Sequence, residues 1–359
     1  MKTRIRKILF RFLFLPLISL IILAVAAIAM LYYQQQRLVK LAVKELNKQL
    51  PGRLVVGGSS ISVFQNFPYV SIAVKDVSFY PGKLRTARAL FEAERIYAGF
   101  SLSDILKQHY HVKVIFLKKG HLDLVEDKNG SLNIIEASRL KSDTAAAAGD
   151  TSAGLDLALK KIVLKDMGIS FLDKQSGQQF IAHIDKIQSS FVTDSLQINA
   201  GMQGAMVVDY LRPGDSTLFR HKHLNADIRI QYGKAGKMLS VQTGKLKLEE
   251  ALFNITGTAD LLHDNTVDLR FAGDRPDFRQ LFSFAPEQLA KELKHFNYDG
   301  HLDFRGTVRG KLQGGNLPLI ELSFSCENGW LHNMETKTKL DSLAFKGYYT
   351  NGAGRSLQT

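Results

Sequence analysis

The sequence predicts a mainly β protein with an N-terminal transmembrane helix, followed by a long, curled antiparallel sheet that forms an elongated β-groove, with a few short helices. Three observations predict this fold. The 22-residue stretch Phe12–Tyr33 contains no charge. From Arg53 onward, apolar and polar residues alternate with the period of two expected of strands with one buried face. Turn-forming pairs such as Asn129-Gly130 and Asp299-Gly300 separate the alternating stretches.

The uncharged stretch Phe12–Tyr33 is long enough to cross a bilayer. As a helix it would extend about 33 Å, and the hydrocarbon core is about 30 Å thick. Only Arg37 and Lys40 follow it closely, whereas five basic residues precede it: Lys2, Arg4, Arg6, Lys7 and Arg11. This asymmetry predicts a single-pass anchor, with the N-terminus in the cytoplasm and the rest of the chain across the membrane.

A cleaved signal peptide is the alternative interpretation of this stretch. Ala24-Val25-Ala26 and Ala27-Ile28-Ala29 both match the small-x-small pattern of cleavage sites. The apolar run continues past both sites, which favours a retained anchor. Both interpretations predict that the remainder of the chain is exported.

The charge and the cysteine count limit the possible partners and the source of stability. The 47 Lys and Arg residues exceed the 34 Asp and Glu residues, giving a net charge of +13. Part of this excess precedes the predicted anchor, and no Lys/Arg-rich tract with interleaved aromatic residues follows, so we expect no nucleic-acid partner. The single cysteine, Cys326, excludes an intrachain disulfide and is predicted to be a small buried hydrophobic residue.

Residues 1–35 are predicted to be the basic start and the anchor, and residues 36–140 a strand-rich region that begins with a stalk helix. In Gln34–Leu50 one helical face carries apolar residues, and Pro51-Gly52 ends the helix. Strand alternation follows, with a bulge predicted at Asp76. A short helical turn at Ser101–Gln108 is expected to bury Leu102, Ile105 and Leu106, and a hairpin strand with Leu132 and Ile134 is expected after Asn129-Gly130.

Residues 141–154 are small, polar and aperiodic, and predict a flexible linker or loop. Residues 155–359 are predicted to be the β-groove region, interrupted by helical structure between Pro276 and Phe296. Because the strand-like Leu343–Tyr349 is followed closely by the end of the sequence, we expect the groove to be truncated there. Periodicity alone leaves two arrangements open, a closed sandwich or a single sheet curled into a trough, and the number of consecutive strands favours the trough.

No pattern in the sequence predicts catalysis. His109, His111 and His121 lie near one another, as do His221 and His223, but no carboxylate or cysteine completes a metal site in either group. The sequence lacks the nucleophile, phosphate-binding and dinucleotide-binding motifs that are typical of common enzymes. We therefore expect no catalytic residue, no cofactor, no metal and no enzymatic activity.

Two blocks of the sequence resemble the AsmA family of envelope proteins. In Ala93–Ile134, a strand leads into the turn of Ser101, Leu102, Ile105 and Leu106, and the block continues through Gly120–Leu124 to Asn129, Gly130 and Asn133. The second block, Phe253–Leu331, is similar to a helix followed by a glycine-bounded strand of that family. Both occur in the expected order after the predicted anchor.

The resemblance implies a protein of the Gram-negative inner membrane, with most of the chain in the periplasm. It implies a β-groove related to bridge-like lipid-transfer proteins, phospholipids as partners together with other envelope proteins, and a role in lipid transport and outer-membrane homeostasis. The alternative is an assembly or scaffolding factor for outer-membrane proteins that captures client strands at a sheet edge. The candidate lipid-lining residues come from the apolar phase of the strands: Leu196, Ile198, Leu224, Ile228, Ile230, Val267, Leu269, Phe271, Leu302 and Phe304.

Overall fold

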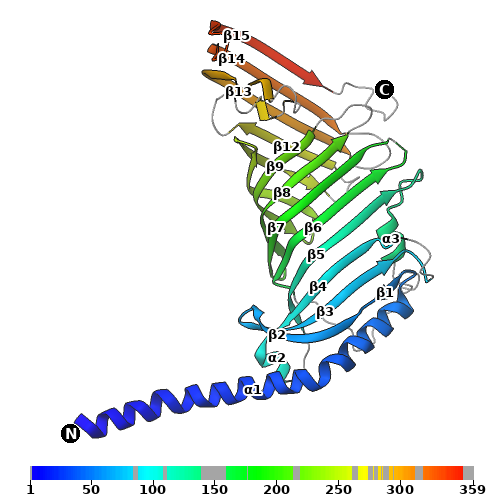
Figure 1. Ribbon diagram of the computed structural model, residues 1–359, viewed down its shortest axis with the longest axis vertical. Coiled ribbons are helices and arrows are strands. Elements are labelled where there is room, and N and C mark those ends of the chain that lie inside the picture. Colours follow the sequence, from blue (N-terminus) through cyan, green and yellow to red (C-terminus); the bar gives the residue numbers. More distant parts are fainter. Residues whose placement is uncertain are drawn as a thin grey trace. The chain divides into compact units, whose positions relative to one another are not determined.

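The computed structural model describes most of the chain (Figure 1). The described residues are 2–83, 88–107, 111–138, 159–175, 177–212, 219–260, 266–273, 278, 282–283, 285, 291–293, 295–311 and 318–350. In the first helix, the side chains of residues 2–21, 24, 27, 31 and 38 are not described. The predicted linker at residues 141–154 lies outside the described residues, and so does His109.

Strands make up most of the described chain, as predicted. The three named helices are α1 (Lys2–Gln49), α2 (Leu102–Leu106) and α3 (Asn133–Ser138). The strands that precede the undescribed residues 139–158 are β1 (Arg53–Val55), β2 (Gly58–Asn66), β3 (Tyr69–Tyr80), β4 (Phe91–Phe100) and β5 (Val112–Glu126). The later strands are β6 (Lys161–Asp173), β7 (Gln179–Thr193), β8 (Gln197–Arg212), β9 (Phe219–Gly233), β10 (Met238–Leu248), β11 (Ala251–Asp260), β12 (Thr266–Gly273), β13 (Phe296–Lys311), β14 (Leu319–Asn333) and β15 (Lys339–Thr350).

The chain divides into two compact units. The first comprises Met1–Gly120 and Ile134–Ile162, and the second comprises His121–Asn133 and Val163–Thr359. In the first unit the strand order is β1-β3-β4-β5, and β2 also pairs with β3. In the second unit the strands from the end of β5 to β15 follow one another in sequence order, so each hydrogen-bonds to its neighbours in the chain. This is the meander that the regular turn signals predict.

Helix α1 is continuous through the predicted anchor and the predicted stalk. It ends at Gln49, directly before the Pro51-Gly52 pair that was expected to stop it. The predicted span Phe12–Tyr33 lies mostly outside the described side chains. Within the part of the chain that the structure describes, no helix is both long and apolar enough to span a membrane.

The core of the first unit is formed by the apolar residues of β3, β4, α2 and β5, and α1 packs against it. Val70, Ile72, Phe100, Ile105 and Val112 are buried together. Partly buried residues of α1 and β2 complete this core: Ile28, Val39, Ile61 and Val63. Helix α1 is therefore attached to this core at two points, at Val39 in the predicted stalk and at Ile28 within the predicted span.

Helix α2 corrects one part of the prediction for Ser101–Gln108. Ser101 caps the helix by accepting a hydrogen bond from the backbone amide of Asp104 at 3.1 Å. Ile105 is fully buried and Leu102 packs against the core, but Leu106 is 40% exposed. In a helix of a single turn, residues three apart share a face, whereas Leu106 follows Ile105 at about 100° around the axis.

The hairpin strand predicted with Leu132 and Ile134 is confirmed only at Leu132, which forms an isolated antiparallel bridge with Glu126, and it is wrong for Ile134, which belongs to helix α3. Asp127 organises the turn before it by accepting hydrogen bonds from the amides of Ser131 and Asn129, and these bonds lower the pKa of its carboxyl group. The Asn133 side chain then bonds to the backbone of β5 at Val125 and Asp123. A side-chain amide thus takes the place that a strand backbone would have occupied.

The interruption predicted at Asp76 is present, but it is not a bulge with a register shift. Asp76 adopts a φ of 49°, in the left-handed region. The pairing of β3 with β4 keeps one register on both sides, from Lys75 opposite Arg95 to Val77 opposite Ala93. The change of phase therefore comes from the backbone conformation of a single residue.

In the second unit, the segment between β12 and β13 covers part of one sheet face. Its described residues 282–283 and 291–293 are helical, in agreement with the helical interruption predicted there. Phe278 is buried and packs against Phe282, Tyr298 and Phe345, with ring centroids 5.7, 6.0 and 6.2 Å away. Pro276, Leu281, Pro286 and Leu289 lie outside the described residues.

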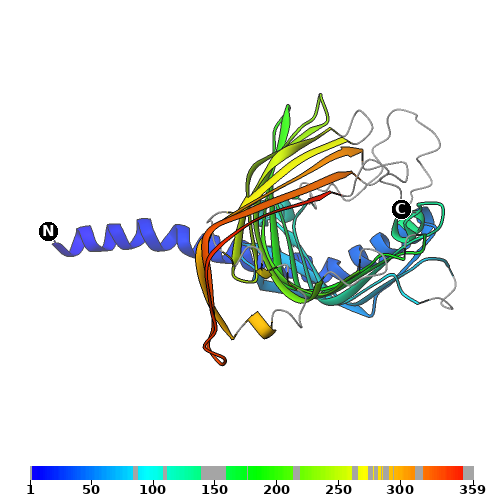
Figure 2. The ribbon, with the colours of Figure 1, turned by 90° about the horizontal axis from the view of Figure 1, so that it is seen from above.

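Taken by itself, the second unit favours the single curved sheet over the sandwich. Its strands belong to one hydrogen-bonded order. Figure 2 shows that they bend strongly along their length. Phe278 and its neighbours are the side chains that bury residues of β10, β11, β13 and β14 on one face, so a short segment covers this region where a sandwich would place a second sheet.

The packing under Phe278 leads to a stability prediction. Leu302 is completely buried in this cluster. We expect Leu302→Ala to lower the free energy of unfolding by about 2–5 kcal/mol, because it removes buried methyl groups and leaves a cavity. Leu252→Ala is the matched control. Leu252 is exposed on β11, on the face of the sheet opposite to the buried cluster, so its substitution should lower the free energy of unfolding by less than about 1 kcal/mol. Chemical denaturation of the purified full-length variants measures both values, and equal losses would contradict this account of the core.

Candidate functional site

The pairing register places nine of the ten candidate lining residues on one face of the second unit. In the middle strands, Ile230 lies opposite Ala200 and Val241, and Ile228 lies opposite Met202 and Gly244. Directly opposed residues in an antiparallel pair point to the same side of the sheet. The alternation within each strand therefore adds up to an apolar surface across neighbouring strands.

The same face continues through the later strands. Leu269 lies opposite Gly257 and Val308, and Phe304 lies opposite Phe324. We call this surface the apolar face; its candidate residues are Ile198, Leu224, Ile228, Ile230, Val267, Leu269, Phe271, Leu302 and Phe304. Polar residues interrupt it in places: Lys222, opposite Val208, is buried at the start of β9, and Ser189 of β7 lies opposite Met202.

Leu196 is the exception among the candidates, and its assignment to a strand was wrong. Strand β8 begins at Gln197, and Leu196 lies in the preceding turn with 76% of its surface exposed. The carboxylate of Asp194 accepts hydrogen bonds at 2.8 Å from the amides of Leu196 and Gln197. These bonds lower the pKa of Asp194 and hold Leu196 in a turn, although its side chain continues the apolar alternation of the sequence.

The apolar face has a covered part and an open part. Leu302 and Phe304 belong to the buried cluster beneath Phe278, and they form the covered part. Val267 is buried too, outside that cluster. The remaining candidates are half-buried and form the open part: Ile198, Leu224, Ile228, Ile230, Leu269 and Phe271. Leu224 and Phe271 lie at its border, because they also pack against the buried cluster. The open part thus keeps apolar surface that the protein itself does not cover.

The tips of two phenylalanine rings occupy the space above glycines of the next strand. Phe271 pairs with Gly306, and Phe324 pairs with Gly347. A Cβ atom added to Gly306 or Gly347 would collide with the ring of its partner. Each glycine therefore provides the space in which the neighbouring ring packs against the sheet.

The opposite face of the same strands is polar. Gln203 Nε2 donates to Asp227 Oδ2 at 3.0 Å, and Arg309 Nε pairs with Asp268 Oδ1 at 3.3 Å. Both contacts are solvent-exposed. The two faces therefore differ in chemistry along the length of the strands, as the alternation predicted.

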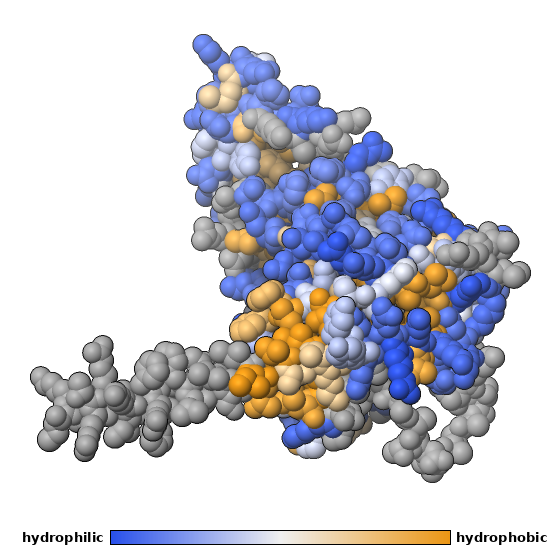
Figure 3. Space-filling model, turned by 60° about the horizontal axis from the view of Figure 1, so that its bottom comes forward, coloured by the Kyte–Doolittle hydropathy of each residue, from blue (hydrophilic) through white to orange (hydrophobic). Residues whose placement is uncertain are grey.

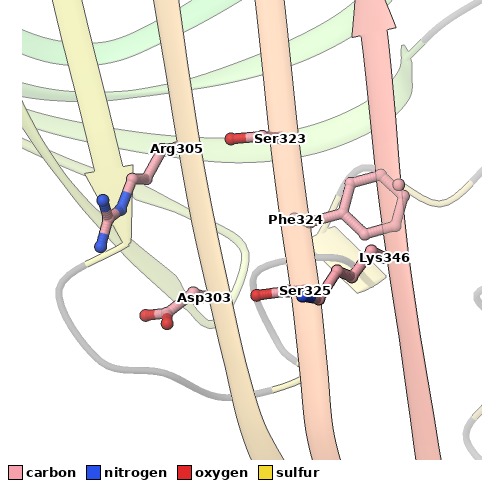
Figure 4. Close-up of a pocket in the computed structure, with 7 residues that line it drawn as sticks. Asp303, Arg305, Ser323, Phe324, Ser325 and Lys346 are labelled. Carbon is pink, nitrogen blue, oxygen red and sulfur yellow. The ribbon is translucent and has the colours of Figure 1, made fainter.

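A shallow cavity of about 410 Å³ lies on this polar face at β13, β14 and β15. In Figure 4, Ser323 and Ser325 point to one side of β14, and the ring of Phe324 points to the other. The lining residues are Asp303, Arg305, Ser323, Phe324, Ser325, Lys346 and Gly347. Arg305 and Lys346 are solvent-exposed, so the cavity offers polar groups but no desolvated charge to hold a small ligand.

One cluster contains the residue types of a hydrolase site but not the arrangement. His121 Nε2 lies 2.8 Å from Asp123 Oδ1, and the Ser170 hydroxyl donates to the same carboxylate oxygen. In a catalytic triad the histidine lies between the serine and the carboxylate and accepts the serine proton. Here the carboxylate lies between them, so this contact does not activate Ser170 as a nucleophile.

His221 and His223, the other histidines that lie near each other in the described chain, each pair with a single carboxylate. His221 Nδ1 lies 3.4 Å from Asp209, and His223 Nδ1 lies 3.4 Å from Glu249. No group of three or more potential metal ligands occurs among the residues that the structure describes. Cys326 is 1% exposed, which confirms the prediction of a buried small residue, and its burial raises the pKa of the thiol.

Comparison of the sequence with models of known protein families gives no match, and comparison with curated proteins gives none either. The functional interpretation therefore depends on the apolar face itself. Sequence reasoning missed the role of Phe278, because a single aromatic residue in an irregular segment has no periodicity. It also left Met202, Val241 and Ile255 out of the candidate set, although their register with Ile228, Ile230 and Phe271 includes them.

The contact between Phe271 and Gly306 predicts a coupled pair. We expect Gly306→Ala to cost about 1–3 kcal/mol of stability, because the new methyl group must displace the ring. In a Phe271→Ala background the same change should cost much less. A double-mutant cycle, measured by chemical denaturation, gives the coupling energy. Equal costs of Gly306→Ala in the two backgrounds would contradict the proposed contact.

Proposed function

We propose that this protein is anchored in a membrane by α1 and binds lipid acyl chains along the open part of the apolar face. The resemblance to the AsmA family suggests the Gram-negative inner membrane as its location and phospholipids as its lipids. On this proposal the bulk of the chain is periplasmic and supports outer-membrane homeostasis by conducting lipids between the envelope membranes. No catalytic residue or cofactor takes part.

The observation that carries the proposal is the exposure of the open part. Leu224, Ile228, Ile230 and Leu269 are neither buried nor isolated, since each lies beside other apolar residues in register. Part of the surface of each side chain stays exposed, and the residues line up across strands, which scattered surface residues would not do. An apolar ligand in contact with this face accounts for both features.

Acyl chains fit this surface energetically. Exposing a chain of about fifteen methylenes to water costs on the order of 12 kcal/mol, at about 0.8 kcal/mol per methylene. A continuous apolar strip lowers this cost at each position that the chain occupies. The binding requires no specific polar group, which agrees with a face that carries aliphatic and aromatic side chains in its open part.

The anchor is supported by the sequence of α1. Its stretch Phe12–Tyr33 contains no charge, and the basic residues are concentrated before it. The helix continues without interruption into the part that packs on the first unit. A continuous connection of this kind would hold the unit close to the bilayer surface.

We predict that the anchor is retained in the mature protein. Membranes from cells that make the full chain should contain a protein that starts at its own N-terminus, because the apolar run extends beyond both small-x-small sites. N-terminal sequencing or intact-mass measurement checks this. A mature terminus at Ala27 or Met30 would show that a signal peptide is cleaved instead.

The lipid-binding face is tested by photo-crosslinking in the full chain. A photoreactive phenylalanine analogue at position Ile228 should form adducts with phospholipid in cells, detected by mass spectrometry. The matched control is the adjacent position Arg229, which is exposed on the polar face of the same strand. Equal lipid labelling at the two positions, or none at either, would contradict the proposal.

Charge substitutions separate lipid binding from stability. Ile228→Asp and Leu269→Asp should reduce crosslinked or co-purified lipid about tenfold, which corresponds to a loss of about 1.4 kcal/mol in the free energy of lipid binding. Because both residues are half-buried, the stability loss should be modest, about 1–2 kcal/mol. Leu302→Asp, in the covered part, should instead lose several kcal/mol, because it buries an unpaired carboxylate.

Two controls complete this test. Arg229→Ser and Asp268→Ser change the polar face and should leave both lipid and melting temperature nearly unchanged. If Ile228→Asp and Leu269→Asp unfold the protein as Leu302→Asp does, and the parent protein carries no lipid, the apolar face is an ordinary core. The proposed transport would then be wrong.

A second candidate function is the capture of a client strand at the edge of the sheet. Among the described residues, β15 pairs with β14 and no strand pairs with its outer edge. Lys339, Asp341 and Lys346 on β15 are exposed charges, and such charges discourage strand addition. Crosslinking from position Ala344 to polypeptide, combined with no lipid at position Ile228, would favour this function over lipid binding.

A further inference from the structure

The β2–β3 hairpin ends in two phenylalanines that the first unit leaves almost completely exposed. Phe64 is 87% exposed and Phe67 is 81% exposed. Exposed single hydrophobic residues are common on protein surfaces and need no explanation. Two aromatic residues at one hairpin tip, next to an apolar helix, are a different case, because water-exposed tips are normally built from small and polar residues.

The hairpin also lacks charge over an unusual length. No Asp, Glu, Lys or Arg occurs from Leu54 to Val74, which includes all of β2 and the tip. The core-facing residues Ile61 and Val63 account for part of this apolar character, since they pack against the first unit's core. Phe64 and Phe67 are not used in that packing, so the fold itself does not require them.

The hairpin is positioned beside the end of the uncharged run in α1. Ile28, which lies within Phe12–Tyr33, packs against the same core cluster as Ile61 and Val63. The described part of the run exposes further apolar residues, including Ile22 and Val25. In Figure 3, hydrophobic residues gather on the surface beside α1.

Helix α2 adds to the same side of the first unit. It contacts α1, and its exposed residue Leu106 is followed by the exposed cation Lys107. Beyond the uncharged run, α1 carries the exposed cations Arg37, Lys40 and Lys44. Apolar and aromatic tips flanked by cations match the chemistry of a bilayer surface, where rings enter the headgroup region and cations meet anionic headgroups.

We infer that the tip of the β2–β3 hairpin, through Phe64 and Phe67, inserts into the lipid headgroup region as a second membrane contact beside α1. The partner is the surface of the same bilayer in which α1 is anchored. This inference rests on the membrane anchor of the proposed function, but not on lipid binding along the apolar face. It explains why two large apolar residues are kept in water-accessible positions and why the hairpin carries no charge.

The test uses tryptophan fluorescence of the full chain in lipid vesicles. The only native tryptophan is replaced by Trp330→Phe, and Phe64→Trp or Phe67→Trp is then introduced. Both positions are exposed, so neither change disturbs the core, and melting temperatures verify this. Vesicles are made from phosphatidylcholine and phosphatidylglycerol, with and without bromine on the acyl chains near the glycerol end. Bromine quenches tryptophan on contact.

We expect emission from both hairpin positions to shift to the blue and to lose most of its intensity in brominated vesicles. The matched control is Ile135→Trp in α3 of the same unit, where the replaced residue is also exposed. It should emit as in water, without quenching. A carbonate wash of the vesicles reports separately whether α1 holds the protein in the membrane.

Three results would overturn the inference. Water-like, unquenched emission from the tip of a protein that withstands the wash shows that the tip stays in solution while the anchor holds. Blue-shifted emission without quenching shows that the tip is covered by protein. Loss of the protein from the vesicles on washing shows that α1 is no anchor, and then the membrane part of the proposed function fails together with the inference.

Discussion

The pairing register of the second unit is the constraint on which its chemistry depends. Side chains alternate between the two faces of a strand, so a slip of one residue would exchange the faces completely. From β8 to β14 the register keeps most apolar residues of this face opposite apolar residues, as for Ile230 between Ala200 and Val241. The polar contacts on the other face, such as Arg309 with Asp268, would be lost by the same slip. Each face therefore helps to specify the other.

Within this register, a short irregular segment decides which part of the apolar face is core and which part is available to a ligand. Phe278 and Phe282 bury the region around Leu302 without forming a strand of a second sheet. Ile228 and Leu269 lie on the same face but remain half-buried. The covered region contributes a buried core to the unit, and the open region is the surface to which we propose that lipid binds.

The alternation of the sequence was sufficient to predict the strands and the face of most candidate residues, because a period of two has a single structural interpretation. Where local hydrogen bonds compete with periodicity, the prediction was wrong. The Asp194 carboxylate holds Leu196 in a turn, and the Asn133 amide replaces strand pairing beyond the single bridge at Leu132. The cover by Phe278 could not be predicted from the sequence, since packing between an irregular segment and a distant strand leaves no local pattern. Leu106 was predicted to be buried, but the adjacent residues Ile105 and Leu106 cannot both face the buried side of a single-turn helix.

The continuity of α1 has a mechanical consequence for the first unit. The helix passes from the uncharged run into the part that packs on the core without a glycine or proline hinge between Ile28 and Val39, both of which contact that core. A helix that enters a bilayer alone leaves its domain free to swivel about the helix axis. Attachment at two points along the helix prevents the domain from bending away from it, and the membrane contact proposed for the hairpin tip would also prevent rotation about the helix axis. The first unit would then keep one fixed orientation relative to the bilayer, whereas a unit held by a single helix could rotate.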